Sequence, residues 1–399
     1  MLQLRDAGPP APLGSVYVHV PFCRDRCTYC AFPTVPDDPA LHAPLVDALL
    51  ARAGAARTPA PLRTLYLGGG TPGLLAPEEL ARLVAGFGAR VAFDPQIEIT
   101  LEVNPRNITQ SALDSWRAAG VTRLSVGVQS FDDGALARHA RLHDGAEARR
   151  ALQLVAAGWS STWSADLLVG WAGQTLEGLR ADLEALLGYE PPHLSVYGLT
   201  IEPRTPLARR ERAGHEVLAP TPLQQEFDGA WTARLRAAGL ERYEVSNFAR
   251  PGHRSRHNQA YWVNQEYLGF GPGAASSVGE LRWIEREEPR AWIAAARAGR
   301  GVRRAVEQLS PAQRLLECVS VGLRTLDGVR LAELDRRFGA GWRERVLPAA
   351  QPLLDAGVLR LDAALRVRED QLSRADAVGR ALAPACLVEA SAARTLVLP

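Results

Sequence analysis

Short runs of apolar and β-branched residues alternate with helical patterns through the first half of this 399-residue chain. Six of the runs predict β-strands, at residues 15–20, 64–67, 97–101, 123–126, 165–169 and 194–197. Helical spacing of apolar residues lies between several of them, at residues 77–87, 111–119, 146–157 and 176–187. Strands separated by helices pair in parallel through right-handed crossovers. Since a closed barrel needs eight such units, the pattern predicts an α/β fold with a partial (β/α)6 barrel.

Polar and glycine-rich motifs occur at or near the ends of these predicted strands. In strand order they are Cys23, the GGGTP segment at residues 68–72, Glu102, Gln129, Asp166 and Tyr197. The carboxyl ends of parallel strands meet at one edge of a barrel, and β/α barrels carry their functional sites there. We therefore expect these groups to lie around one site.

The pattern changes after about Leu240. Residues 241–279 are rich in aromatic residues, Asn and Gly, and residues 310–325 predict an amphipathic helix with Ser310 as its N-cap. Residues 358–361 and 365–367 predict a small two-stranded wing. The expected division is an N-terminal tail at 1–14, a partial barrel at 15–245, a connecting region at 246–300, and a smaller, mostly helical C-terminal domain at 301–399 with a winged-helix-like hairpin.

The net charge, the apolar runs and the cysteine spacing predict where the protein is located and which partners it does not bind. The formal net charge is +2, so no strong field attracts nucleic acid. The first 14 residues contain no apolar signal-peptide core, and no apolar run of about 18 residues predicts a transmembrane anchor. Five cysteines, of which three fall within eight positions, predict metal or redox chemistry in a reducing compartment. We therefore expect a cytoplasmic protein that does not bind nucleic acid.

Cys23, Cys27 and Cys30 form a C-x3-C-x2-C motif on one short segment. Three thiolates can hold three irons of a [4Fe–4S] cluster and leave the fourth iron open to a ligand. A structural zinc site is an alternative, but zinc needs a fourth ligand and usually uses two C-x2-C pairs. His19 is the nearest candidate, and it lies within a predicted strand. Incidental free thiols are the third interpretation.

The other edge motifs are weak signals when taken alone. The glycine run is also explained by a tight turn between a strand and a helix. Glu102 is also explained by a salt bridge at the surface. Asp166 lies among apolar residues, where a carboxylate needs partners.

The cysteine spacing and the partial barrel together resemble the radical SAM superfamily, in which S-adenosylmethionine chelates the open iron and is cleaved to a radical. The resemblance implies that a set of residues contacts S-adenosylmethionine, namely Tyr17, Gly69, Gly70, Thr71, Glu102, Gln129, Arg141 and Asp166, with Gly198 as a further match.

Longer motifs narrow the resemblance to one branch of that superfamily. YVHVPFC, LYLGGGTP, RLSVGVQSFDD, YEVSNFARPG, RHNQAYW and LECVSVGLRTLDGV are similar to the branch that contains oxygen-independent coproporphyrinogen III oxidase and the HemW family of heme chaperones. Similarity to the oxidase implies radical decarboxylation of a porphyrin precursor. The HemW family implies binding of heme and its delivery to acceptor hemoproteins, including membrane-associated respiratory proteins.

Three features favour the HemW family and a protein that lacks the oxidase activity. Phe32 stands where the oxidase has a fourth cysteine, and the chain reaches Tyr17 with a short N-terminal arm. The segment from His257 to Trp262 matches the HNxxYW motif. An imidazole can be an axial ligand of heme iron, so His257 is the expected heme contact. The alternative is a structural histidine beside a packed Tyr–Trp pair.

The sequence departs from the branch's usual motifs in three places. WAGQT at 171–175 replaces LPGQT, His139 and Ala140 replace Leu and Gly, and Ala275 replaces a histidine. Two further alternatives stay open. One is a radical C-methyltransferase, for which the sequence shows no second S-adenosylmethionine site, and the other is a zinc-stabilised barrel of unrelated function.

Overall fold

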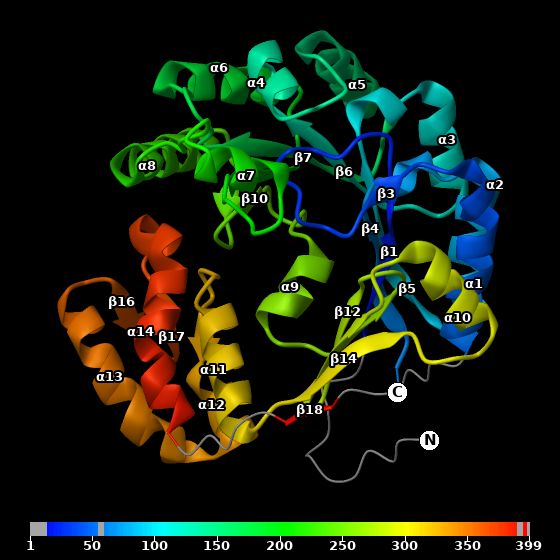
Figure 1. The fold of residues 1–399 in the computed structure, drawn as a ribbon. Helices are drawn as coiled ribbons and strands as arrows, with labels where there is room; N and C mark the ends of the chain where they lie inside the picture. The colour runs from blue at the N-terminus through cyan, green and yellow to red at the C-terminus, as the bar shows by residue number, and fades with distance from the viewer. Residues whose placement is uncertain (1–13, 55–59, 389–393, 397–399) are drawn as a thin grey trace.

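The computed structural model describes residues 14–54, 60–388 and 394–396. Within them, one large sheet runs through the molecule in the order β18-β14-β13-β12-β11-β1-β4-β5-β6-β7-β8-β10-β9 (Figure 1). The six predicted strands are confirmed as its parallel centre: β1 (Ser15–Val20), β4 (Leu62–Gly69), β5 (Phe93–Val103), β6 (Arg123–Gln129), β7 (Thr162–Val169) and β8 (His193–Gly198). The prediction of a partial barrel is therefore correct.

Further strands extend the sheet on both sides. At one side β11 (Tyr267–Phe270) pairs in parallel with β1, and at the other β10 (Asn247–Ala249) pairs antiparallel with β8. The remaining strands of this sheet are antiparallel additions: β9 (Glu241–Arg242), β12 (Ala275–Val278), β13 (Leu281–Glu285), β14 (Arg303–Gln308) and β18 (Arg394–Leu396). The aromatic and Asn-rich segment after residue 240 thus continues the barrel sheet.

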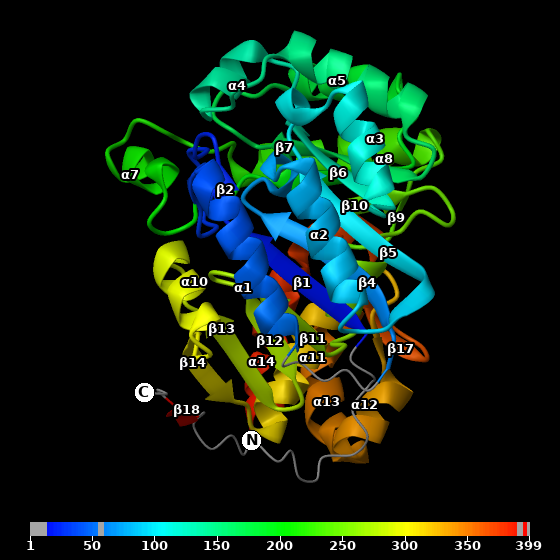
Figure 2. The ribbon, with the colours of Figure 1, turned by 90° about the vertical axis from the view of Figure 1, so that its right-hand side faces the viewer.

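Helices cover the outside of the curved sheet (Figures 1 and 2). They are α1 (His42–Gly54), α2 (Pro77–Gly88), α3 (Gln110–Ala118), α4 (Asp133–Arg138), α5 (Gly145–Gly158), α6 (Leu176–Leu187) and α8 (Thr221–Ala237). Two more are α7 (Pro206–Arg212), where Leu207 N–H donates to Thr28 O, and α10 (Pro289–Arg297), which lies beside α1. The apolar faces of most of these helices pack against one face of the parallel strands, and together they form one core. None of the helices in the described segments is long and apolar enough to cross a membrane.

One helix lies on the inner side of the sheet instead. It is α9 (Arg256–Trp262), which carries the HNxxYW motif (Figure 1). Glu98 on β5 accepts hydrogen bonds from the backbone N–H groups of Arg256 (3.2 Å) and His257 (3.0 Å). A carboxylate at this position satisfies free donors in the first turn of the helix and fixes α9 against the barrel.

The C-terminal region has its own core and the element order expected of a winged helix. Its elements are α11 (Pro311–Gly322), β15 (Val329–Arg330), α12 (Leu331–Phe338), α13 (Arg343–Asp355), β16 (Leu359–Leu361), β17 (Ala364–Val367) and α14 (Ala375–Leu387). The predicted wing is confirmed as the β16–β17 pair in a three-stranded sheet with β15. The boundary at residue 301 stays a prediction, with β14 in the large sheet and the second core beginning at Leu315.

The capping box at the start of α11 gives a stability prediction. Gln313 N–H donates to Ser310 Oγ (3.3 Å), and Ser310 N–H donates to Gln313 Oε1 (2.8 Å). We expect Ser310→Ala to lower the free energy of unfolding by about 1 kcal/mol, because it removes the acceptor for a helix-end donor. Urea unfolding followed by circular dichroism measures this loss. Ser373→Ala, at an exposed serine, is the control, and an equal effect of the two substitutions would contradict the capping role.

Candidate functional site

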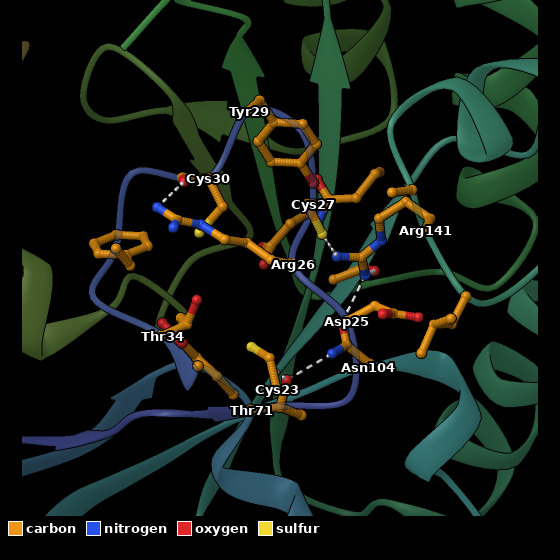
Figure 3. Close-up of a pocket in the computed structure, with 18 of the residues that line it drawn as sticks. Cys23, Asp25, Arg26, Cys27, Tyr29, Cys30, Thr34, Thr71, Asn104 and Arg141 are labelled. Carbon is orange, nitrogen blue, oxygen red and sulfur yellow. Dashed lines mark hydrogen bonds between the residues drawn. The ribbon is translucent and has the colours of Figure 1, made fainter. Parts of the chain in front are cut away.

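The three clustered cysteines line one cavity of about 470 Å³ at the carboxyl edge of the parallel strands. Cys23 ends the short strand β2 (Phe22–Cys23), which pairs with β3 (Val35–Pro36), and Cys27 and Cys30 lie on the connecting loop. Figure 3 shows the three thiols around the same space. We call residues 23–34 the cluster loop.

The glycine-rich segment fixes the start of the cluster loop through its backbone. Gly70 N–H donates to Val20 O (2.8 Å), and Thr71 N–H donates to Phe22 O (2.8 Å). A Cβ on Gly70 would lie 2.5 Å from Phe22 O, which is closer than real Cβ contacts allow. Only glycine therefore permits this approach, and Thr71 comes to lie beside Cys23, with 3.8 Å between Oγ1 and Sγ.

Arg141 ties the middle of the cluster loop to the barrel. Its guanidinium donates to Cys27 Sγ (3.3 Å) and to Asn104 Oδ1 (2.6 Å). The Asn104 amide in turn donates to Thr71 Oγ1 (2.8 Å). A chain of hydrogen bonds thus runs from Cys27 to Thr71, next to Cys23 (Figure 3). Burial raises the pKa of Cys23 to about 11, and the hydrogen bond from Thr71 and the nearby Arg141 guanidinium oppose this rise.

Two carboxyl groups form the inner wall of the cavity. Glu102 accepts from Tyr66 OH (2.7 Å) and from Gly69 N–H (3.0 Å). Burial raises the pKa of Glu102 to about 7, although both hydrogen bonds oppose the change. Asp166 accepts from Ser125 Oγ (3.0 Å), and burial likewise raises its pKa. Both carboxyl groups are therefore held against the cavity by hydrogen bonds from the barrel.

The structure brings most of the predicted S-adenosylmethionine contacts to this cavity. Those that line it are Gly69, Gly70, Thr71, Glu102, Gln129, Arg141 and Asp166, together with Gly198. Gln129 has a φ of +69°, a conformation rare for residues with a side chain, at an irregular end of β6.

Tyr17 does not line the cavity. Its hydroxyl lies 3.0 Å from His19 Nδ1, and its ring stacks on Tyr66 with 6.0 Å between centroids. Tyr17 is therefore one layer below the cavity wall, where it supports Tyr66 and, through it, Glu102.

His257 also lies away from the cavity and is only 1% exposed. Its Nδ1 lies 2.8 Å from Thr64 Oγ1, and its Nε2 lies 2.7 Å from Tyr261 OH. Its ring packs on Tyr66 with 4.9 Å between centroids. Burial lowers the pKa of His257 to about 3, so the imidazole is neutral. In this conformation both ring nitrogens are engaged, and the HNxxYW motif forms the floor of the partial barrel.

Asn104 and Ser125 are cavity residues that the sequence motifs did not identify. Asn104 follows Glu102 by two positions, in the segment LEVNP at residues 101–105. Residues two apart in an extended segment share a face, so this spacing was a usable signal. Ser125 gave no signal, because its contact with Asp166 joins two neighbouring strands.

The thiols do not form a compact mononuclear site. Among the residues that the structure describes, no three His, Cys, Asp or Glu side chains converge closely enough to hold one metal ion. Tetrahedral zinc would need thiolate sulfurs within about 4 Å of one another, given bonds of about 2.3 Å. Three separate thiols around a roomy cavity instead fit a polynuclear cluster, with each cysteine on a different iron.

A partial barrel with a three-cysteine loop at its carboxyl edge defines the class of radical SAM proteins. The model of the Radical SAM superfamily matches residues 17–186, and the model of the HemN C-terminal domain matches residues 309–368. The structure of coproporphyrinogen III oxidase (HemN) from Escherichia coli superposes with a TM-score of 0.79 over 94% of this chain and 90% of its own, at 23% identity. At this sequence identity, the similarity establishes a shared fold only.

Curated relatives define the family. The heme chaperone HemW of Mycobacterium tuberculosis is 36% identical over 363 residues, 88% of this chain and 89% of its own. That of Synechocystis sp. is 34% identical over 339 residues, 80% of each chain. The mitochondrial radical S-adenosyl methionine domain-containing protein 1 of Bos taurus is 36% identical over 345 residues, 81% of this chain and 76% of its own. The chain therefore belongs to the HemW family of radical SAM proteins.

The raised pKa of Glu102 predicts a pH-dependent stability of the apoprotein. The folded protein holds this proton up to about pH 7, whereas the unfolded chain releases it near 4.5, so the residue lowers stability as the pH rises between these values. We expect Glu102→Gln to gain stability relative to wild type between pH 5 and pH 8, by up to about 3 kcal/mol. Urea unfolding at the two pH values measures it. Exposed Glu226→Gln is the control, and a difference from wild type that is the same at both pH values would contradict the assignment.

Proposed function

We propose that this protein is a heme chaperone that carries a [4Fe–4S] cluster and S-adenosylmethionine, and that it delivers heme to acceptor hemoproteins. The observation that carries the cofactor assignment is that Cys23, Cys27 and Cys30 line one cavity together with all the predicted S-adenosylmethionine contacts except Tyr17. The HemW relatives support the chaperone assignment.

The residues of the cavity suit both cofactors. The three cysteines would hold three irons and leave the fourth open toward the cavity. Glu102 and Asp166 offer carboxyl oxygens for the hydroxyl and amino groups of S-adenosylmethionine, and the glycine backbone of residues 69–70 allows close approach. When bound and reduced, the cluster would supply an electron to cleave the sulfonium. In a heme chaperone, the cluster and S-adenosylmethionine would have a structural or regulatory role.

The rival function within the fold is oxidation of coproporphyrinogen III. Phe32 disfavours it, because the oxidase has a cysteine at this position and Phe32 here is 60% exposed at the cavity. The likeness to the oxidase structure is one of fold only, at 23% identity.

The sequence also predicted His257 as a heme ligand, and this stays a prediction. Ligation would require His257 to leave its buried position and to break its contacts with Thr64 and Tyr261. We propose that the acceptors are hemoproteins, membrane-associated respiratory proteins among them. We further propose a cytoplasmic location, because all five cysteines are free thiols in the structure.

The cluster assignment gives a direct prediction. Replacing Cys23, Cys27 and Cys30 together by alanine should abolish iron and acid-labile sulfide in anaerobically reconstituted protein, because three thiolate ligands are lost. Circular dichroism should show that the fold persists. The matched control replaces Cys318 and Cys386, which lie in the C-terminal core, and should keep full cluster content. Full cluster absorbance in the triple variant would refute the ligand assignment.

The chaperone and oxidase functions are separated by one paired assay of the reconstituted protein. Incubation with coproporphyrinogen III, reductant and S-adenosylmethionine should give no protoporphyrinogen. A parallel heme titration should show stoichiometric binding and transfer to an apo-hemoprotein. Formation of protoporphyrinogen would make the protein an oxidase in spite of Phe32.

A further inference from the structure

Two large apolar side chains are exposed at the mouth of the cluster cavity. Phe32 on the cluster loop keeps 60% of its surface exposed, and Leu142, which follows Arg141, keeps 42%. Both line the cavity. Because they share one cavity mouth, they offer an apolar surface there to a ligand.

Guanidinium groups lie beside these apolar side chains. Arg24 and Arg26 are exposed on the cluster loop and line the same cavity. The Arg24 guanidinium makes no hydrogen bond or ion pair within the described residues, and Arg26 donates only to Cys30 O (3.2 Å). Asp25 lies between them, so the local charge remains positive. We call Arg24, Arg26, Phe32 and Leu142 the cavity rim.

We propose that the cavity rim binds heme, with Phe32 and Leu142 against the macrocycle and Arg24 and Arg26 paired with its propionates. The proposal rests on the proposed function and names the heme site within it. A flat apolar ring with carboxylates on one side matches an apolar surface flanked by free guanidinium groups.

The volume of the cavity determines how S-adenosylmethionine and heme would bind together. A cavity of about 470 Å³ suits one drug-sized molecule, and its inner residues Glu102 and Asp166 suit S-adenosylmethionine. Heme would then lie across the mouth, over the cluster and S-adenosylmethionine. This arrangement leaves His257 in its buried position, with both ring nitrogens hydrogen-bonded.

The test is a heme titration of the full-length reconstituted protein with two matched pairs of variants. Phe32→Ser is paired with Val263→Ser, since Val263 is 64% exposed and follows the HNxxYW helix. Arg24→Ala is paired with Arg63→Ala, since Arg63 is exposed on β4, at the end away from the cavity. Iron content of each variant shows that the cluster is intact. Heme dimethyl ester, in which the propionates are uncharged, is the second probe.

We expect Phe32→Ser and Arg24→Ala each to weaken heme binding about tenfold, while Val263→Ser and Arg63→Ala match wild type. Wild type should bind the dimethyl ester more weakly than heme, and Arg24→Ala should discriminate less between the two probes. Heme binding that is unchanged by both rim substitutions would overturn this site and leave the proposed chaperone function standing. Absence of heme binding by wild type would overturn both.

Discussion

Two backbone hydrogen bonds join the glycine-rich segment to the end of β1 and the start of β2, and they determine the rest of the site. They join Gly70 to Val20 and Thr71 to Phe22, each at 2.8 Å. They form only because residue 70 lacks a Cβ, which would lie 2.5 Å from Phe22 O. Cys23 therefore begins the cluster loop at the edge of the sheet where β4 ends, beside the residues that line the cavity.

The second constraint is the buried guanidinium of Arg141. It reaches Cys27 on the cluster loop and Asn104 beyond β5, and Asn104 reaches Thr71. Three other segments of the chain, at Thr71, Asn104 and Arg141, therefore hold Cys23 and Cys27 in place. Such pre-organisation lowers the entropy that cofactor binding has to overcome.

The sequence predicted the parallel strands well, because strand periodicity is a local property. The spacing of the three cysteines is also local, and it places their thiols around one cavity. The C-terminal wing at residues 358–367 was likewise readable from its short apolar runs. The environment of His257 was not predictable, since its partner Thr64 is far away in the chain and only folding shows that both ring nitrogens are occupied. Tyr17 was placed in the site by resemblance, whereas packing on Tyr66 holds it below the cavity.

We propose that the cluster has an open iron that faces the cavity, and that S-adenosylmethionine binds there. Electron paramagnetic resonance of the reduced, reconstituted protein tests it most directly, in the presence and absence of S-adenosylmethionine. The account predicts a reduced [4Fe–4S] signal whose g values change when S-adenosylmethionine is added, since the ligand alters the coordination of one iron. A cluster signal that is identical with and without S-adenosylmethionine would contradict it.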